Sequence, residues 1–210
     1  MKKNADSPRA RLLALIAAAL LGPALGGCAA LVIGGAFVGG SLIVTDRRTS
    51  GAQIDDQSIE IKANNRVREQ VGDRGHVNTT SYNRLVLLTG EVATETDKAA
   101  VEQAISRVDN VRSVVNELGV TGISSLTSRS NDTFLTGKVK ASLVDAKDIL
   151  ANAFKVVTER GTVYLMGRVS EREATRASDV ARSVTGVQKV VRVFEILTEA
   201  ELAELPKVSK

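Results

Sequence analysis

Apolar residues recur along residues 55–197 first with the spacing of a helix, then of strands, then of a helix again. Ile59, Ala63 and Val67 recur every fourth position, which predicts a helix with one inward face. Segments bounded by turn residues follow at 77–89 and predict a β-hairpin. A second amphipathic helix and a last apolar strand complete the order α-β-β-α-β.

The same pattern occurs twice in the chain. The segment "LTGEV" (88–92) recurs as "LMGRV" (165–169), and "VDNVRSVVNEL" (108–118) recurs as "VTGVQKVVRVF" (184–194), at an offset of 76 or 77 residues. A repeat of this length is two small domains rather than a solenoid. We therefore predict an α+β fold with two tandem α-β-β-α-β units, each a small mixed sheet packed on two helices. Because small domains have thin cores, we expect the two units to pack against each other.

Residues that cap helices predict where the helices begin. Asp56 and Asp132 occupy equivalent positions and are expected to cap the first helix of each copy. Ser170 and Glu173 have the spacing of a capping box and predict the start of the second helix of copy two.

The first residues of the chain have the layout of a secretory signal. A positively charged start precedes the apolar run "LLALIAAALL" (12–21), Pro23 interrupts it, and two glycines lead to Cys28, the only cysteine of the chain. The segment "LGGC" resembles the lipobox of bacterial lipoproteins. That resemblance implies cleavage before Cys28 and acylation of its thiol.

Two alternatives to a lipidated cysteine remain open. One is an uncleaved signal anchor that contains a buried, inert Cys28. The other is a membrane-spanning helix through residues 29–44, although this segment is short for a bilayer and interrupted by glycines. We favour lipidation because the charged start, apolar run, break, small residues and cysteine follow one another in order.

The repeated unit resembles the BON domain, on its element order, the Gly-x-Val after its second strand, and the endings of residues 108–118 and 184–194. Two such units behind a lipobox cysteine resemble the dual BON-domain outer-membrane lipoproteins of Gram-negative bacteria, a family of division- and outer-membrane-stress-associated lipid-binding lipoproteins. The resemblance implies a lipid-anchored protein on the periplasmic face of the outer membrane. It also implies support of outer-membrane integrity and BON domains that bind phospholipid.

These patterns and the resemblance together give a predicted organisation of the whole chain. It consists of a lipoprotein signal peptide (1–27), a lipidated Cys28 with an apolar glycine-rich tether (28–54), BON domain 1 (55–121), a linker (122–131), BON domain 2 (132–198) and an acidic tail (199–210).

The two copies differ in the first helix, where Phe134 stands in place of Ser58. Phe134 lies beside the inward stripe, and Lys138 follows four residues later on the same side. An exposed aromatic ring beside cations is typical of helices that lie in a membrane interface. We hypothesise that this helix binds anionic phospholipid, phosphatidylglycerol or cardiolipin, and that Phe134 inserts as a wedge. The residues expected to bind lipid are Phe134, Leu135, Lys138, Lys140 and Arg129.

Other interpretations of this helix and of the repeats remain. Phe134 packs at the seam between the two domains in the simplest alternative, and the lysines are then ordinary solvated side chains. A second alternative for the protein is a periplasmic adaptor for envelope assembly proteins, which would use the outer sheet face or the first helix of copy one. A third is a hydrolase of unrecognised type.

Composition argues against nucleic acid as a partner and against a metal or cofactor. Most of the formal net charge of +4 lies in the first 27 residues, aromatic residues make up 3% of the chain, and tryptophan is absent. With one cysteine and one histidine, a zinc site of the usual kind is not expected. We therefore predict no nucleic acid partner, no metal site and no cofactor.

No constellation of side chains predicts catalysis. His76 lies in the glycine-flanked segment "DRGHVN" and is expected to be an exposed loop residue without a function. Asp145, Asp148 and Glu159 are scattered along the sequence without an evident partner. Because a nucleophile, base or metal centre is required, we predict that the protein is not an enzyme.

Overall fold

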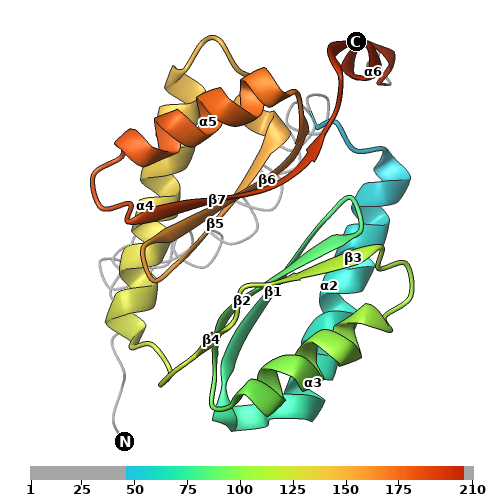
Figure 1. Cartoon of the computed structure of the whole chain (residues 1–210), viewed down its shortest axis with the longest axis vertical. Coiled ribbons are helices and arrows are strands. Elements are labelled where there is room, and N and C mark those ends of the chain that lie inside the picture. The colour runs from blue at the N-terminus through green and yellow to red at the C-terminus, as the bar shows by residue number, and fades with distance from the viewer. Residues whose placement is uncertain (1–45, 206–210) are drawn as a thin grey trace, which may run out of the picture. The chain divides into compact units, whose positions relative to one another are not determined.

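A computed structural model of the chain describes residues 46–205, which belong to one compact unit. This unit contains two copies of the order α-β-β-α-β, called here repeat 1 (residues 50–120) and repeat 2 (residues 126–196) (Figure 1). The prediction of an α+β fold with two tandem units is therefore confirmed. The predicted signal peptide, Cys28 and the tether as far as residue 45 lie outside the described residues, whereas residues 50–54, also predicted as tether, are helical.

Repeat 1 begins with a long helix and ends with a broken strand. Its elements are α2 (Ser50–Val71), a 3-10 helix (Gly72–Arg74), β1 (His76–Tyr82), β2 (Leu85–Val92), α3 (Glu95–Ser106), β3 (Ser113–Asn116) and β4 (Gly119–Val120).

Repeat 2 has the same order, with a last strand that is continuous. Its elements are α4 (Leu126–Asp145), a 3-10 helix (Ala151–Ala153), β5 (Phe154–Glu159), β6 (Thr162–Val169), α5 (Glu171–Ser183) and β7 (Lys189–Ile196). A further helix, α6 (Glu199–Glu204), follows and begins with a capping box formed by Thr198 and Glu201. The segment predicted as an acidic tail therefore starts as a helix.

Each sheet is mixed and is covered by two helices. β1 pairs with β2 in antiparallel orientation, and β2 pairs with β3 and β4 in parallel orientation. β5 and β6 are likewise antiparallel, while β6 and β7 are parallel. Helices α2 and α3 contact the first sheet, and α4 and α5 contact the second (Figure 1). A crossover helix is what a parallel pair of neighbouring strands requires.

The predicted apolar stripes form the cores. Ile59, Ala63 and Val67 pack with strand residues such as Val86 and Leu88 in the core of repeat 1. The core of repeat 2 is formed in the same way by side chains of α4, α5, β5 and β6. Burial of these stripes is the main reason that the segments adopt helices with one inward face.

The first helix of each repeat begins earlier than its sequence predicts. Thr49 and Ser125 provide the caps, because their side chains accept hydrogen bonds from the amides of Ala52 and Ser128. The prediction that Asp56 and Asp132 are the caps is wrong. The second half of the segment predicted as the linker, residues 126–131, is likewise helical and belongs to α4.

Asp56 and Asp132 instead hold the hairpin turns from inside the helices. The Asp132 carboxylate accepts hydrogen bonds from the backbone amides of Arg160 and Gly161, at 2.8 and 2.9 Å. Asp56 accepts from the amides of Asn83 and Arg84 in the same way, at 2.8 and 2.7 Å. A buried carboxylate is stable here because it satisfies donors that the helix and strands leave unpaired.

These turns need unusual backbone angles. All four central residues have positive φ, 50° at Asn83, 66° at Arg84, 50° at Arg160 and 73° at Gly161. A two-residue loop with positive φ at both positions matches the natural twist of a hairpin. Three of these four residues are not glycine, and positive φ is strained for them. The aspartate of each first helix therefore stabilises a turn whose backbone is unfavourable by itself.

The glycine of each Gly-x-Val segment is required by close backbone contact. A Cβ atom on Gly90 would lie 2.0 Å from the carbonyl oxygen of His76. A Cβ on Gly167 would lie 2.5 Å from the carbonyl oxygen of Ala153. Both distances are far inside van der Waals contact, so the neighbouring chain can approach only because no side chain is present.

The sheet faces that carry no helices meet each other. Tyr82 and Leu87 of repeat 1 pack with Tyr164, Met166 and Val193 of repeat 2 in a third buried cluster, called here the interface cluster. Polar contacts surround it: Asn83 donates to Glu195 at 2.7 Å, and Lys155 donates to Glu60 at 2.8 Å. The expectation that the two units pack together and share burial is confirmed.

The residues just before α2 contact both repeats. Arg47 donates to both carboxylate oxygens of Glu173 in repeat 2, at 2.7 and 2.8 Å. Arg48 donates to Asp56 at 2.8 Å and lies 4.4 Å from the centre of the Tyr82 ring, both in repeat 1. This pair of arginines therefore ties the start of the described chain to each repeat.

Candidate functional site

The outward face of α4 presents several large apolar side chains to solvent. Leu126, Phe134 and Val144 are 78%, 71% and 66% exposed. Leu126 and Val144 are five helical turns apart and lie on one line along the helix, and Phe134 lies between them about 80° to one side. The apolar positions extend over about 27 Å of helix, so the helix can lie flat on an apolar or interfacial partner.

Phe134 is paired with a cation. The ammonium Nζ of Lys138 lies 5.8 Å from the centre of the Phe134 ring, and it donates a hydrogen bond to the carbonyl oxygen of Thr185 at 2.7 Å. A lysine within about 6 Å of an aromatic face is in cation–π range. The alternative in which Phe134 packs at the seam between the repeats is wrong, because most of its surface is exposed.

The other residues predicted to bind lipid are placed differently from one another. Lys140 is exposed on α4. Arg129 lies within the first turns of α4 and donates to the carbonyl oxygen of Ser124 at 3.0 Å. Leu135 is 7% exposed and belongs to the core of repeat 2. Leu135 also lines the pocket beside Phe134, so its contact with lipid stays a prediction, with little of its surface exposed for it.

A shallow pocket adjoins the Phe134–Lys138 pair. It measures about 540 Å³ and includes the side chains of Phe134, Lys138, Arg160 and Gln188. Lys138 and Arg160 are cationic, against one carboxylate in the lining, that of Asp132. The pocket is of the size that binds small polar groups, and its charge favours an anion.

A separate and larger cavity lies in repeat 1. The pocket beside Phe134 has a volume of about 540 Å³. The cavity of about 900 Å³ belongs to repeat 1, where it lies between α3 and β3 and includes Ala99, Gln103 and Val114. Of the two, only the pocket beside Phe134 adjoins an exposed aromatic ring with a cation beside it.

Repeat 1 has a different arrangement at the equivalent positions. Ser58 replaces Phe134, and Lys62 stands where repeat 2 has Lys138. Lys62 Nζ forms an ion pair with the Asp109 carboxylate at 2.9 Å, and this hydrogen bond lowers the pKa of Asp109 below its usual range. The lysine of repeat 1 therefore has an acidic partner, whereas Lys138 donates to a neutral carbonyl.

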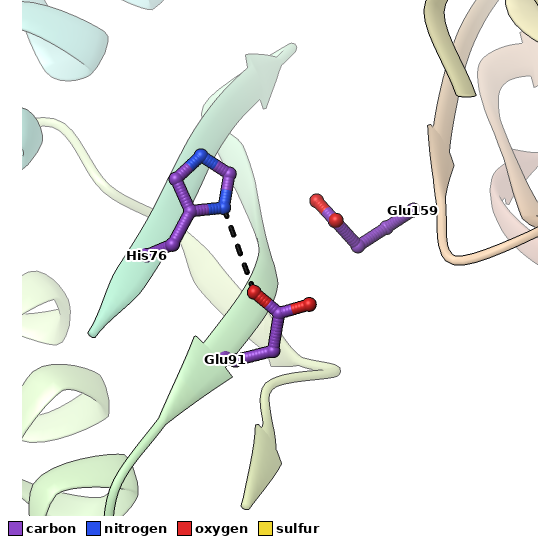
Figure 2. A group of neighbouring side chains, drawn as sticks. All are labelled: His76, Glu91 and Glu159. Carbon is purple, nitrogen blue, oxygen red and sulfur yellow. Dashed lines mark ion pairs between the residues drawn. The ribbon is translucent and has the colours of Figure 1, made fainter. Parts of the chain in front are cut away.

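A second group of side chains lies where the repeats meet. One ligand atom each of His76, Glu91 and Glu159 lies within 4.8 Å of the other two (Figure 2). The structure corrects two predictions: His76 is the first residue of β1 rather than an exposed loop residue, and Glu159 is a buried residue that accepts a hydrogen bond from Asn78 at 2.9 Å.

Burial shifts the ionisation of this group. Burial, helped by the nearby charge of Arg129, lowers the pKa of His76 below its ordinary value, against the opposing effect of Glu91. Burial also raises the pKa of Glu159, and the hydrogen bond from Asn78 opposes this rise. Both shifts favour the uncharged forms of these two side chains.

Sequence reasoning missed this group because its members come from three strands of two repeats. His76, Glu91 and Glu159 are far apart in the chain, and none has a neighbour in sequence that suggests a site. Only the pairing of β1 with β2, in which His76 stands opposite Glu91, and the packing of repeat 2 against this pair bring them together.

A protein-family model identifies the class of protein. A profile of the BON domain matches residues 55–122 and residues 131–198, one match for each repeat. The chain therefore belongs to the BON-domain family and contains two copies of the domain. Within residues 46–205, no helix is long and apolar enough to cross a membrane.

Relatives narrow the class further. The chain is 38% identical to the outer membrane lipoprotein DolP of Haemophilus influenzae over 91% of this chain and 98% of that protein. It is 31% identical to a 21 kDa hemolysin of Actinobacillus pleuropneumoniae, over 71% of this chain and 78% of the relative. The osmotically-inducible protein Y of Escherichia coli is 28% identical over 67% of this chain and 72% of its own length. These similarities support a dual BON-domain lipoprotein of the outer membrane.

Proposed function

We propose that the protein is a non-catalytic outer-membrane lipoprotein that binds anionic phospholipid through α4 of its second BON domain and supports outer-membrane integrity. The observation that carries the proposal is the exposed Phe134 ring with the Lys138 ammonium beside it. Leu126 and Val144 add apolar surface along the same helix.

The physical basis is the structure of a membrane interface. An aromatic ring gains free energy when it leaves water for the boundary between headgroups and acyl chains. A lysine near an anionic surface contributes about 1 kcal/mol. Phe134 therefore supplies the apolar contact, while Lys138 and Lys140 meet the lipid phosphates. Arg129 contributes charge from the start of the helix and remains bonded to Ser124.

The test is a titration with phosphatidylglycerol micelles, followed by amide NMR of the chain from Thr45 onward. Phe134→Ala is expected to weaken binding roughly tenfold, because it removes about 1.4 kcal/mol of apolar transfer. Lys138→Glu is expected to weaken it further at low salt, because attraction becomes repulsion. Ile61→Ala is the matched control, since Ile61 is 66% exposed on the equivalent helix of repeat 1.

Two results would contradict this proposal. One is that both α4 variants show the same shift perturbations as the parent chain. The other is equal binding to phosphatidylcholine micelles, which carry no net charge. An unchanged response to Ile61→Ala, with loss in the α4 variants, supports a site on α4.

The anchor is a separate part of the proposal. The predicted acylation of Cys28 is tested by mass spectrometry of the mature N-terminal peptide. We expect a peptide that begins at Cys28 with lipid on its thiol and on its amino group. An unmodified thiol with the leader still attached would remove the anchor from the proposal and leave the role of α4 to be judged by the lipid titration.

A second candidate function is an adaptor that contacts envelope assembly proteins. The outer sheet faces, which this function was expected to use, contribute to the interface cluster and are covered there. Of the two surfaces expected for an adaptor, the outward face of α2 is the one left open to a partner. Ile54 and Ile61 are 67% and 66% exposed there, two turns apart. A photo-crosslinker at position 61 in intact envelopes is expected to capture a protein if this function holds, whether or not Phe134 is replaced.

A further inference from the structure

Strand geometry directs three ligand-type side chains toward the contact between the repeats. Each of the three, His76, Glu91 and Glu159, is an even number of residues away from a residue on its own strand that belongs to the interface cluster or packs against it. Because side chains alternate across a strand, they face the same side as those partners. The partners are Tyr82 on β1, Leu87 on β2 and Val157 on β5.

The group contains buried polar atoms whose bonding capacity is unused. The side chain of Glu91 is fully buried, and its Oε1 has no hydrogen-bond partner among the described residues. The same holds for Nδ1 of His76, which lies 3.7 Å from Glu91 Oε2, too far for a hydrogen bond. The other Glu91 oxygen, Oε2, accepts from Ser124 at 3.2 Å. Buried carboxylate and imidazole atoms of this kind are normally satisfied by a partner.

We propose that His76, Glu91 and Glu159 bind one divalent transition-metal ion, with Zn²⁺ the best fit. Zinc bonds to histidine nitrogen and carboxylate oxygen are each about 2.0–2.2 Å long. Two such ligand atoms lie about 3.4 Å apart at the tetrahedral angle, and His76 Nδ1 and Glu91 Oε2, at 3.7 Å, are close to this separation. Glu159 lies within 4.8 Å of both and completes three protein ligands by a small side-chain rotation.

The type of ligand selects the type of ion. One imidazole nitrogen with two carboxylates suits Zn²⁺, whereas Mg²⁺ and Ca²⁺ prefer oxygen ligands throughout. A water molecule would supply the fourth position of a tetrahedral site. His76 and Glu159 also line a cavity of about 360 Å³, which gives an ion and its water a path to the group.

Two arginines close to the three side chains carry positive charge that opposes the binding of a cation. Arg160 Nη1 lies 3.7 Å from Glu91 Oε1, and half of the Arg160 side chain is exposed. It can turn into solvent when an ion takes over the carboxylate. Arg129 is held by Ser124 and stays in place. The arginine at position 160 therefore competes with the ion, and its removal should strengthen metal binding.

Metal binding at this position would join the two repeats. His76 and Glu91 belong to repeat 1, and Glu159 belongs to repeat 2. An ion that bonds to all three would stabilise their contact by its binding free energy. This inference is independent of the lipid-binding proposal, since none of the three residues lies on the outward face of α4.

The first test is Zn²⁺ binding to the untagged full chain in a nonionic detergent, in a Cys28→Ser background so that no thiol can bind metal. Competition with a chromophoric chelator is expected to show one Zn²⁺ per chain. His76→Ala and Glu159→Gln should each weaken binding at least tenfold. Arg160→Gln should strengthen it several-fold. Glu195→Gln, which alters another carboxylate between the repeats, is the control and should leave it unchanged.

The second test is the X-ray absorption spectrum of the zinc-loaded chain. It should show nitrogen and oxygen ligands at about 2.0–2.1 Å and the scattering of one imidazole, which His76→Ala should abolish. Circular dichroism establishes that each variant is folded before it is compared. Absence of stoichiometric Zn²⁺ binding, or equal affinity in the parent, His76→Ala and Glu159→Gln chains, would overturn the proposal.

Discussion

The first helices of the two repeats, α2 and α4, share their inward side chains and differ in their outward ones. Ile59 and Leu135 occupy equivalent positions and are both buried. One position earlier, repeat 1 has Ser58 and repeat 2 has the exposed Phe134. A core side chain contacts many neighbours and is constrained by all of them, whereas an outward side chain is free to diverge toward a partner.

The lysines beside these positions show the same divergence in charge. Lys62 pairs with Asp109, and its equivalent Lys138 donates to the carbonyl of Thr185, the residue that stands in place of Asp109. The two repeats therefore share a scaffold, but only repeat 2 presents an aromatic ring, Phe134, beside a lysine that has no acidic partner at position 185. This difference is the basis for the proposal that repeat 2, rather than repeat 1, binds lipid.

The largest expected effect comes from the aspartates that brace the hairpin turns. Asp56→Ala should lower the free energy of unfolding by about 3–5 kcal/mol, because it removes the two turn contacts, a buried hydrogen bond from Ser81 and the ion pair with the partly buried Arg48. Asp132→Ala removes only the two turn contacts and should cost about 2–3 kcal/mol. Denaturant unfolding measures both.

Asp55→Ala is the control for that comparison. Asp55 pairs with Arg84 at the surface, where an ion pair contributes at most about 1 kcal/mol. If Asp132→Ala were as mild as Asp55→Ala, the interior carboxylates would not be what stabilises the turns.

A smaller effect is expected at the carboxylates of the second helices, Glu173 and its equivalent Asp97. The hydrogen bonds from Arg47 lower the pKa of Glu173 below its ordinary value. A lowered folded-state pKa adds stability above the ordinary value of about 4.5, and this stability is lost as the pH falls through the folded-state value. Glu173→Gln should lower the free energy of unfolding by about 1–3 kcal/mol at pH 7, and by less below pH 4.5.

Asp97→Asn is the comparison that shows how much the ion pair between Arg47 and Glu173 contributes, because Asp97 has no bond to Arg47. Asp97 pairs at 3.1 Å with Arg74, a mostly exposed side chain of the same repeat. Its replacement should cost less than Glu173→Gln at pH 7. Equal losses for the two variants, measured by urea unfolding at pH 7 and pH 4, would show that Arg47 adds nothing to the helix cap.

The smallest expected effect is on lipid affinity at position 185. Thr185→Asp gives Lys138 the acidic partner that Lys62 has, and should weaken binding to phosphatidylglycerol micelles a few-fold, equivalent to about 0.5–1 kcal/mol. The reverse exchange, Ser58→Phe with Asp109→Thr, should give repeat 1 measurable binding. NMR shift perturbations on α4 and α2 report each result, and failure of both exchanges would show that the ring and lysine do not define the difference.

Much of the fold follows from local patterns in the sequence. The stripe at Ile59, Ala63 and Val67 predicted a helix, and the capping box at Ser170 and Glu173 predicted where α5 begins; both are present in the structure. The helix starts at Thr49 and Ser125 could not be predicted in the same way, because aspartates at 56 and 132 are equally good caps by local chemistry.

The candidate sites show the same division. Phe134 and Lys138 are four residues apart on one helix, so periodicity alone places them together. His76, Glu91 and Glu159 have no such spacing and meet only through strand pairing and the contact between repeats.

The sequence by itself determined the repeat, the order of its elements, the inward stripes and the outward aromatic, because each depends on residues within a few positions of one another. The tertiary structure decided what Asp56 and Asp132 do, which sheet faces are covered and where His76 meets two carboxylates. These features depend on contacts between distant segments, and burial in such contacts, rather than residue type, decides whether a charged side chain is solvated, bonded to a turn or available to a ligand.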